Sequence, residues 1–325
     1  MDIILNTYGL SLNRDNECFI ISTRDGKQRI PTEGVKSIQV CRGVQVTSDA
    51  IMLAIEHEIE ILFVDKAGTP MGRVWSSRFG SISTIRKGQL NFCYSHEAVD
   101  WIKTVIDRKI ENQQAMMLLL TPPDGPDPET ERNIRRLEDY RSKIRALDGE
   151  VVHDIANTLR GWEGQASHIY FATINGYLPA CYRFEARSQH PALDIVNALL
   201  NYGYGILYGR IEGMMIKAGV DPYIGILHRD NYNRPVLVYD VIELYRIWVD
   251  YVVYTLVAQG VVTDEYYSVR PDGSYWLEPL GRRILIQSLT DYLEEVITTG
   301  GERRSRLTVI SLYIQSLAQR FKKLV

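Results

Sequence analysis

The chain has 325 residues, of which 45% are hydrophobic and 24% are charged, as in an ordinary globular protein. This length predicts about two domains and a core that depends on neither disulfides nor structural metal. The 37 basic residues are outnumbered by 40 acidic ones, giving a formal net charge of −3. This balance excludes binding of nucleic acid by bulk electrostatics, so any DNA contact must use local basic patches.

Several features bear on the compartment of the protein. Residues 1–5 have neither a basic segment nor a long apolar stretch, so we expect no secretory signal. The most apolar segment, residues 247–262, is too short to span a bilayer and is interrupted by Asp250. The four cysteines are far apart and form no Cys-x-x-Cys pair, which argues against a zinc site and a disulfide framework. We therefore expect a cytoplasmic protein with no membrane contact.

Residues 1–90 have the pattern of a β-rich domain. Short apolar runs are separated by polar turns, and Asp25-Gly26 is typical of a β-hairpin. One helix is expected where Ser48 can act as N-cap, because apolar residues recur at helical spacing after it. The apolar run at residues 61–64 then predicts a buried strand.

Residues 91–325 have long apolar stripes at helical spacing. The prolines between residues 121 and 128 predict a loop, because a helix interior does not accommodate them. Helices are expected at about residues 129–147, 191–218, 240–258, 279–298 and 304–324, with a hairpin around residues 271–273. The predicted fold class is α+β, with a small β-rich N-terminal domain (1–90) and a larger all-α domain (91–325).

Three segments of the chain place an acidic or imidazole side chain in an unusual sequence context. Glu163 lies among small residues, and His228 ends an apolar run that follows a Gly/Pro turn. Asp240 and Glu243 are three residues apart in an otherwise apolar segment, so they share one helix face. Each place also has a purely structural interpretation. These are a hydrogen bond to a neighbour for Glu163, a core histidine for His228, and a capping box for the last pair.

If these segments meet, electrostatics demands positive charge between them. Two carboxylates about 4 Å apart repel by about 4 kcal/mol at an effective dielectric constant of about 20. Glu163 and Glu243 would therefore need a shared proton or cation. Carboxylates with one imidazole suit Mg²⁺ or Mn²⁺ better than zinc, and such a cation would polarise a phosphoryl oxygen.

Four motifs occur in order along the second half of the chain. They are Glu163-Gly164-x-Ala166, Arg187-x-x-His190-Pro191-x-x-Asp194-x-x-Asn197, Gly219-x-Asp221-Pro222-x-x-Gly225-x-x-His228 and Asp240-x-x-Glu243-x-x-Arg246. Residues 30–31, 63–68 and 109–113 extend the likeness over nearly the whole chain. In these motifs the chain resembles the CRISPR-associated endonuclease and integrase of the adaptation stage, the first protein of the Cas series.

The resemblance implies a metal site with Glu163, His228 and Glu243 as ligands of Mg²⁺ or Mn²⁺, and with Asp240 as a further catalytic residue close by. It implies cleavage of double-stranded DNA and joining of the 3′-hydroxyl ends of foreign fragments to the CRISPR repeat by transesterification. It also implies a homodimer formed through the β-rich domain and a partner, the small second CRISPR-associated adaptation protein. The third ligand position is often Asp in the family and is Glu243 here. Ala192 replaces the second residue of a usual Pro-Pro pair.

Two clusters of basic residues are candidate DNA contacts. Residues 131–145 contain six basic and three acidic residues, and residues 302–323 contain six basic residues and one acidic residue. Arg78, Arg86 and Lys87 fall in the expected interdomain linker. Solvated helix faces are the alternative interpretation of these clusters.

Two other functions stay open from the sequence. One is a metal-dependent phosphodiesterase that acts on branched DNA or RNA, and the other is a non-catalytic DNA-binding scaffold. For a scaffold, removal of the candidate carboxylates would leave every activity unchanged.

Overall fold

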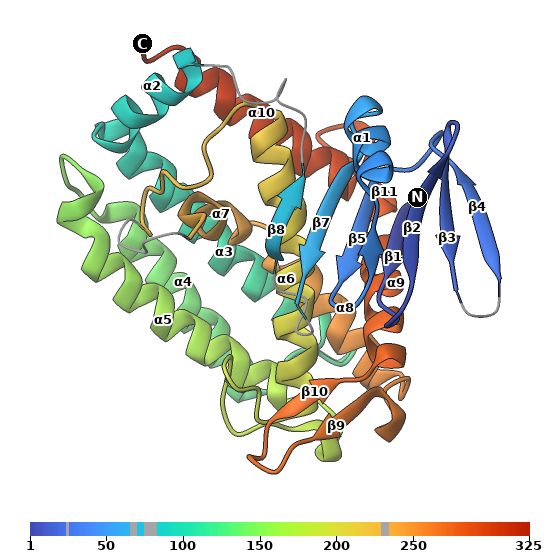
Figure 1. Ribbon diagram of the computed structural model, residues 1–325. Helices are drawn as coiled ribbons and strands as arrows, with labels where there is room; N and C mark the ends of the chain where they lie inside the picture. Colours follow the sequence, from blue (N-terminus) through green and yellow to red (C-terminus); the bar gives the residue numbers. More distant parts are fainter. Residues whose placement is uncertain (24–25, 66–69, 75–82, 229–233) are drawn as a thin grey trace. The chain divides into compact units, whose positions relative to one another are not determined.

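The computed structural model in Figure 1 describes residues 1–23, 26–65, 70–74, 83–228 and 234–325. The chain forms two compact units, Met1–Ser81 and Ile82–Val325. The boundary that the sequence placed after residue 90 falls within helix α2 (Ser83–Cys93) of the second unit. Asp25 of the expected turn, residues 66–68 of one family motif and Arg78 lie outside the described residues.

The first unit contains two small sheets among its described residues. One sheet has the order β1 (Asp2–Leu5), β5 (Ser37–Cys41), β7 (Glu60–Val64), β8 (Pro70–Val74). The other has the order β4 (Lys27–Pro31), β3 (Cys18–Ser22), β2 (Ser11–Asp15), β6 (Gln45–Val46). In the first sheet β5 pairs in parallel with both β1 and β7, and the last strand is antiparallel. Strands β2, β3 and β4 form an antiparallel ribbon, so the predicted β-rich domain is confirmed.

Helix α1 (Ser48–Glu56) completes the core of the first unit. Its N-cap is Thr47 rather than the predicted Ser48, because the Thr47 hydroxyl accepts a hydrogen bond from the backbone N–H of Ala50 at 3.3 Å. The helix buries Leu53 in one hydrophobic cluster with residues of both sheets, such as Phe19 and Ile38. The unit therefore has a core of its own.

The second unit is mainly helical, as predicted. Its helices are α2, α3 (His96–Leu119), α4 (Pro128–Ala146), α5 (Val152–Gly176), α6 (Ile195–Lys217), α7 (Val236–Ile242), α8 (Arg246–Ala258), α9 (Pro279–Glu294) and α10 (Arg306–Lys322). Short 3₁₀ helices occupy Ala180–Tyr182 and Asp264–Tyr266. Helices α3, α4 and α5 lie side by side, and α6 packs on α7, α8, α9 and α10 (Figure 1). No helix in the described part of the chain combines the length and apolar character that crossing a membrane requires.

Three helix limits differ from the prediction. The expected helix at residues 240–258 is two helices, α7 and α8, separated by a turn that contains Glu243. Helix α6 begins at Ile195 rather than at Pro191, because the Asp194 carboxylate caps it by accepting from the Asn197 N–H at 2.7 Å. Helix α9 ends at Glu294 rather than at residue 298, because a strand begins at Val296.

Two antiparallel hairpins interrupt the helices of the second unit. The predicted hairpin around residues 271–273 is present as β9 (Tyr267–Val269) and β10 (Tyr275–Leu277). A second hairpin, β11 (Val296–Thr299) with β12 (Glu302–Ser305), replaces the ends of two predicted helices. The second unit is thus helical with two short hairpins rather than helical throughout.

Candidate active site

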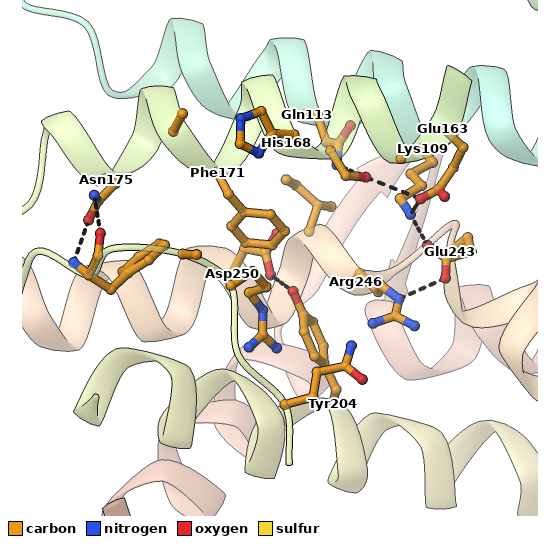
Figure 2. Close-up of a pocket in the computed structure, with 18 of the residues that line it drawn as sticks. Lys109, Gln113, Glu163, His168, Phe171, Asn175, Tyr204, Glu243, Arg246 and Asp250 are labelled. Carbon is orange, nitrogen blue, oxygen red and sulfur yellow. Dashed lines mark hydrogen bonds and ion pairs between the residues drawn. The ribbon is translucent and has the colours of Figure 1, made fainter. Parts of the chain in front are cut away.

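A cavity of about 490 Å³ lies within the second unit. Its walls come from α3, α5, α6, α8 and residues 184–189, and several charged side chains face it (Figure 2). The charged groups on the lining are Lys109, Glu163, Glu185, Arg187, Glu243, Arg246 and Asp250. Two of the predicted ligands, Glu163 and Glu243, are therefore on one cavity wall.

The ammonium of Lys109 brings these two carboxylates together. Lys109 Nζ donates to Glu163 Oε1 and lies 2.6 Å from Glu243 Oε2. Lys109 is 9% exposed and Glu243 is 7% exposed, so most of this ion cluster is shielded from water. Figure 2 shows the three side chains converging from α3, α5 and the turn between α7 and α8. The prediction that the two acids need a cation between them is met by a lysine that the sequence reasoning did not assign.

Further donors fix both carboxylates. Ser167 Oγ donates to Glu163 Oε1 at 3.1 Å, and Arg246 Nε donates to Glu243 Oε1 at 2.9 Å. Burial by itself raises the pKa of Glu243, but the charges of Arg246 and Lys109 outweigh it and lower that pKa to about 2. Burial acts to lower the pKa of Lys109, yet the two carboxylates raise it above its ordinary value. Glu243 and Lys109 therefore stay ionised at neutral pH.

His228 and Asp240 form a second group beside this cluster. Asp240 is completely buried, and one of its oxygens accepts the backbone N–H groups of Ile226 at 2.8 Å and Leu227 at 3.1 Å. The other oxygen lies 2.7 Å from His228 Nδ1. The capping-box interpretation of Asp240 is wrong, because this carboxylate bonds residues 226–228 and not the start of a helix.

The imidazole of His228 is 34% exposed and is not part of the cavity lining. Because Asp240 engages Nδ1, Nε2 is the ring nitrogen suited to a ligand. A carboxylate behind a histidine is the usual support of a metal-binding imidazole.

The three predicted ligands have side chains of a kind that divalent metals bind. In the described ranges no three His, Cys, Asp or Glu side chains are arranged as a metal-binding group. Glu163, Glu243 and His228 nevertheless offer two carboxylates and one oriented imidazole, a donor set suited to Mg²⁺ or Mn²⁺. For one ion to bind all three, Lys109 would have to leave the position between the carboxylates, and the imidazole of His228, which is outside the cavity lining, would have to reach them.

The segment that carries His228 is held by side chains that the sequence reasoning missed. Gln89 on α2 is fully buried and donates from Nε2 to the carbonyls of Asp221 at 2.7 Å and Ile224 at 3.0 Å. Its Oε1 accepts the Asp221 N–H at 3.0 Å. Gly225 is needed in this segment because a Cβ there would lie 2.6 Å from the His228 carbonyl oxygen. No local pattern identifies Gln89, since its partners lie more than a hundred residues away.

A second polar cluster lies in the cavity wall around Asp250. Its carboxylate accepts hydrogen bonds from the hydroxyls of Tyr170, at 2.9 Å, and of Tyr204. Burial raises the pKa of Asp250 and holds both tyrosine pKa values well above their usual range. The guanidinium groups of Arg187 and Arg246 lie over the Tyr204 ring, at 5.5 and 4.8 Å from its centroid. Two fixed cations therefore line the cavity beside the acidic pair.

The basic cluster at residues 131–145 is partly used within the protein. Arg141 and Arg145 both bind Asp107, at 3.1 and 2.9 Å, which removes them from a free basic surface. Arg132 and Arg136 on α4 are exposed.

The basic cluster at residues 302–323 also contains both side chains bound within the protein and exposed ones. Arg306 is bound by Glu295, whereas Lys322 and Lys323 near the end of α10 are exposed. Of the expected linker residues, Arg86 lies 3.9 Å from Asp221.

Comparison with known proteins identifies the family of the chain. Residues 3–291 match the family described as CRISPR associated protein Cas1. The chain belongs to the Cas1 family. It is 28% identical to CRISPR-associated endonuclease Cas1 1 of Archaeoglobus fulgidus, over 98% of this chain and 95% of that protein. It is 31% identical to CRISPR-associated endonuclease Cas1 2 of Rhodospirillum rubrum, over 75% of this chain and 72% of that protein.

Solved structures share the fold of the chain. A casposase bound to integration product matches with a TM-score of 0.84 and 20% identity, over 99% of this chain and 90% of that one. A Cas1 protein of Thermotoga maritima matches with a TM-score of 0.81 and 19% identity, over 99% and 97%. A chain of a Cas6-RT-Cas1–Cas2 complex matches with a TM-score of 0.83 and 21% identity; our chain spans only 35% of its length.

The charge of Glu243 gives a prediction about stability and pH. Its folded pKa of about 2 is below the ordinary value of 4.5, so ionisation stabilises the fold above about pH 4.5. That contribution, about 3 kcal/mol, is lost as the pH falls from 4.5 towards 2. We expect urea denaturation to show a stability gap between wild type and Glu243→Gln that shrinks over this range. Glu185→Gln, in the same cavity but exposed, should show no such gap, and a gap independent of pH would contradict the prediction.

The bonds of Gln89 give a second prediction. Gln89→Leu keeps the volume but leaves the carbonyls of Asp221 and Ile224 without these donors, so residues 221–228 should open more often. We expect amide hydrogen exchange there to be about tenfold to a hundredfold faster, measured by mass spectrometry. The control is Gln114→Leu, which removes a buried glutamine that bonds the Ile134 carbonyl at 3.0 Å. Equal changes at residues 221–228 in both variants would show that the effect is general destabilisation.

Proposed function

We propose that this chain is a divalent-metal-dependent DNA endonuclease and integrase, which inserts foreign fragments into a CRISPR array by 3′-hydroxyl transesterification. Membership of the Cas1 family supports the reaction class. The observation that carries the proposal is the convergence of Glu163 and Glu243 on one cation in a cavity. Replacing a whole buried ion cluster with apolar residues is often neutral or stabilising, so a non-catalytic scaffold would gain little from keeping it.

Glu163, Glu243 and Nε2 of His228 would hold Mg²⁺ or Mn²⁺, whose chemistry is to polarise a phosphoryl oxygen and stabilise developing negative charge. Other side chains of the protein position these three ligands. Asp240 orients the imidazole, while Ser167 and Arg246 hold the two carboxylates.

The cavity wall adds groups suited to a phosphodiester substrate. The guanidinium groups of Arg187 and Arg246 offer fixed donors for phosphate oxygens. Because these groups are anchored over the Tyr204 ring, they need little reorganisation when negative charge develops.

The proposed partners are double-stranded DNA, a second copy of the chain and the small second CRISPR-associated adaptation protein, in the cytoplasm. The similar casposase is bound to an integration product, and another similar structure is a complex with Cas2, which supports DNA and this partner. We propose the β-rich unit as the homodimer contact. The exposed Arg132, Arg136, Lys322 and Lys323 are the side chains proposed to contact phosphates.

Joining of DNA ends tests this function. With protospacer duplex, a CRISPR repeat and Mn²⁺, the protein with its small partner should give half-site joined products. Glu163→Gln and His228→Ala should lower product formation at least a hundredfold but leave duplex binding mostly intact, because the metal site and the phosphate contacts use different residues. Glu265→Gln, which changes an exposed acid within the 3₁₀ helix Asp264–Tyr266, should keep wild-type activity.

Other outcomes of the same assay separate the alternatives. Cleavage without joining, especially of branched DNA or RNA, would favour a phosphodiesterase. If both active-site variants keep every activity of the wild type, the non-catalytic DNA-binding scaffold is the alternative that remains.

A further inference from the structure

Lys109 holds three separate parts of the second unit together through one ammonium group. It extends from α3 to Glu163 on α5 and to Glu243 in the turn after α7. Asn112, one turn further along α3, donates to the Leu244 carbonyl at 3.0 Å and fixes the same turn. In this arrangement the acidic pair is neutralised by the chain itself, without any bound metal.

Three of the four carboxylate oxygens of the acidic pair are already engaged. Lys109 and Ser167 both donate to Glu163 Oε1. Arg246 binds Glu243 Oε1, and Lys109 lies against Glu243 Oε2. A divalent cation shared by the two acids would take the space of the ammonium, and two positive charges at so short a distance repel strongly. Binding of the metal and the double contact of Lys109 are therefore mutually exclusive.

The same helix offers a new partner to a displaced ammonium. Gln113 is four residues from Lys109 on α3, so both side chains lie on one face of the helix and line the same cavity. Gln113 Oε1 is buried and has no hydrogen-bond donor among the described residues. This oxygen can accept a donor that has left the carboxylates.

We propose that Lys109 is a tethered counter-cation that orders the acidic pair in the metal-free protein and withdraws when Mg²⁺ or Mn²⁺ binds. This inference rests on the proposed function, because it takes Glu163 and Glu243 as the metal ligands. Lys109 is then a positioning residue: it keeps the ligands near each other before the metal arrives, and its displacement weakens metal affinity. A lysine suits this exchange because it is a mobile point charge on a flexible stem.

The test compares Mn²⁺ binding and melting of wild type, Lys109→Met and Lys103→Met. Lys103 lies on the same helix outside the cavity lining and serves as the control. In EDTA, Lys109→Met should melt at a lower temperature than wild type, because two carboxylates then share Arg246 alone. It should bind Mn²⁺ at least tenfold more tightly by calorimetry, and Mn²⁺ should raise its melting temperature more. Lys103→Met should behave like wild type.

Mn²⁺ affinity that is equal or weaker in Lys109→Met would overturn the role of Lys109 and leave the proposed metal site standing. Mn²⁺ binding to neither protein would overturn both. If Lys109→Met does not fold, NMR of the wild-type protein labelled with ¹⁵N-lysine tests the proposed role of Lys109 instead. The protected ammonium signal of Lys109 should shift or exchange with water when Mg²⁺ saturates the site, and an unchanged signal would refute the proposal.

Discussion

The site depends on one electrostatic constraint: two carboxylates from distant segments cannot lie together in a buried wall without positive charge between them. Lys109 supplies that charge, and Arg246 adds a second cation to Glu243. Because α3, α5 and the turn after α7 each contribute one member, the ion cluster also fixes how these elements pack around the cavity. The low pKa of Glu243 follows from these cations, which outweigh the cost of its burial.

A second group of buried polar contacts positions His228 independently of that cluster. Gln89 holds the start of the segment, and Asp240 bonds its last backbone N–H groups and the imidazole. Arg160 on α5 also donates to the Leu227 carbonyl. Three helices thus fix a segment that has no regular structure of its own. The acidic pair and the histidine are ordered by different partners, so for all three to bind one metal ion Lys109 must leave the carboxylates and the imidazole must reach them.

The sequence predicted the α+β class, because apolar periodicity is a local property. The meeting of Glu163 with Glu243 was implied only by the resemblance to the family, because the residues alone do not show which distant segments pack together. The sequence also predicted that a proton or a cation must lie between the two acids if they meet, but not that the chain itself provides the cation. Lys109 fits an ordinary helical pattern, and only the packing of α3 brings it to the acids. The role of Gln89 could not be predicted for the same reason, because its hydrogen-bond partners are distant in the sequence. The number of basic residues at 131–145 also overstated the free basic surface there, because Arg141 and Arg145 are bound to Asp107.

The most direct measurement is a crystal structure with Mn²⁺, in which anomalous scattering locates the ion without assumption about its ligands. The account predicts one peak per subunit bonded to Glu163, Glu243 and His228 Nε2, with Lys109 Nζ no longer touching both carboxylates. A peak at other residues, or full occupancy beside a Lys109 that still bridges the acidic pair, would contradict it.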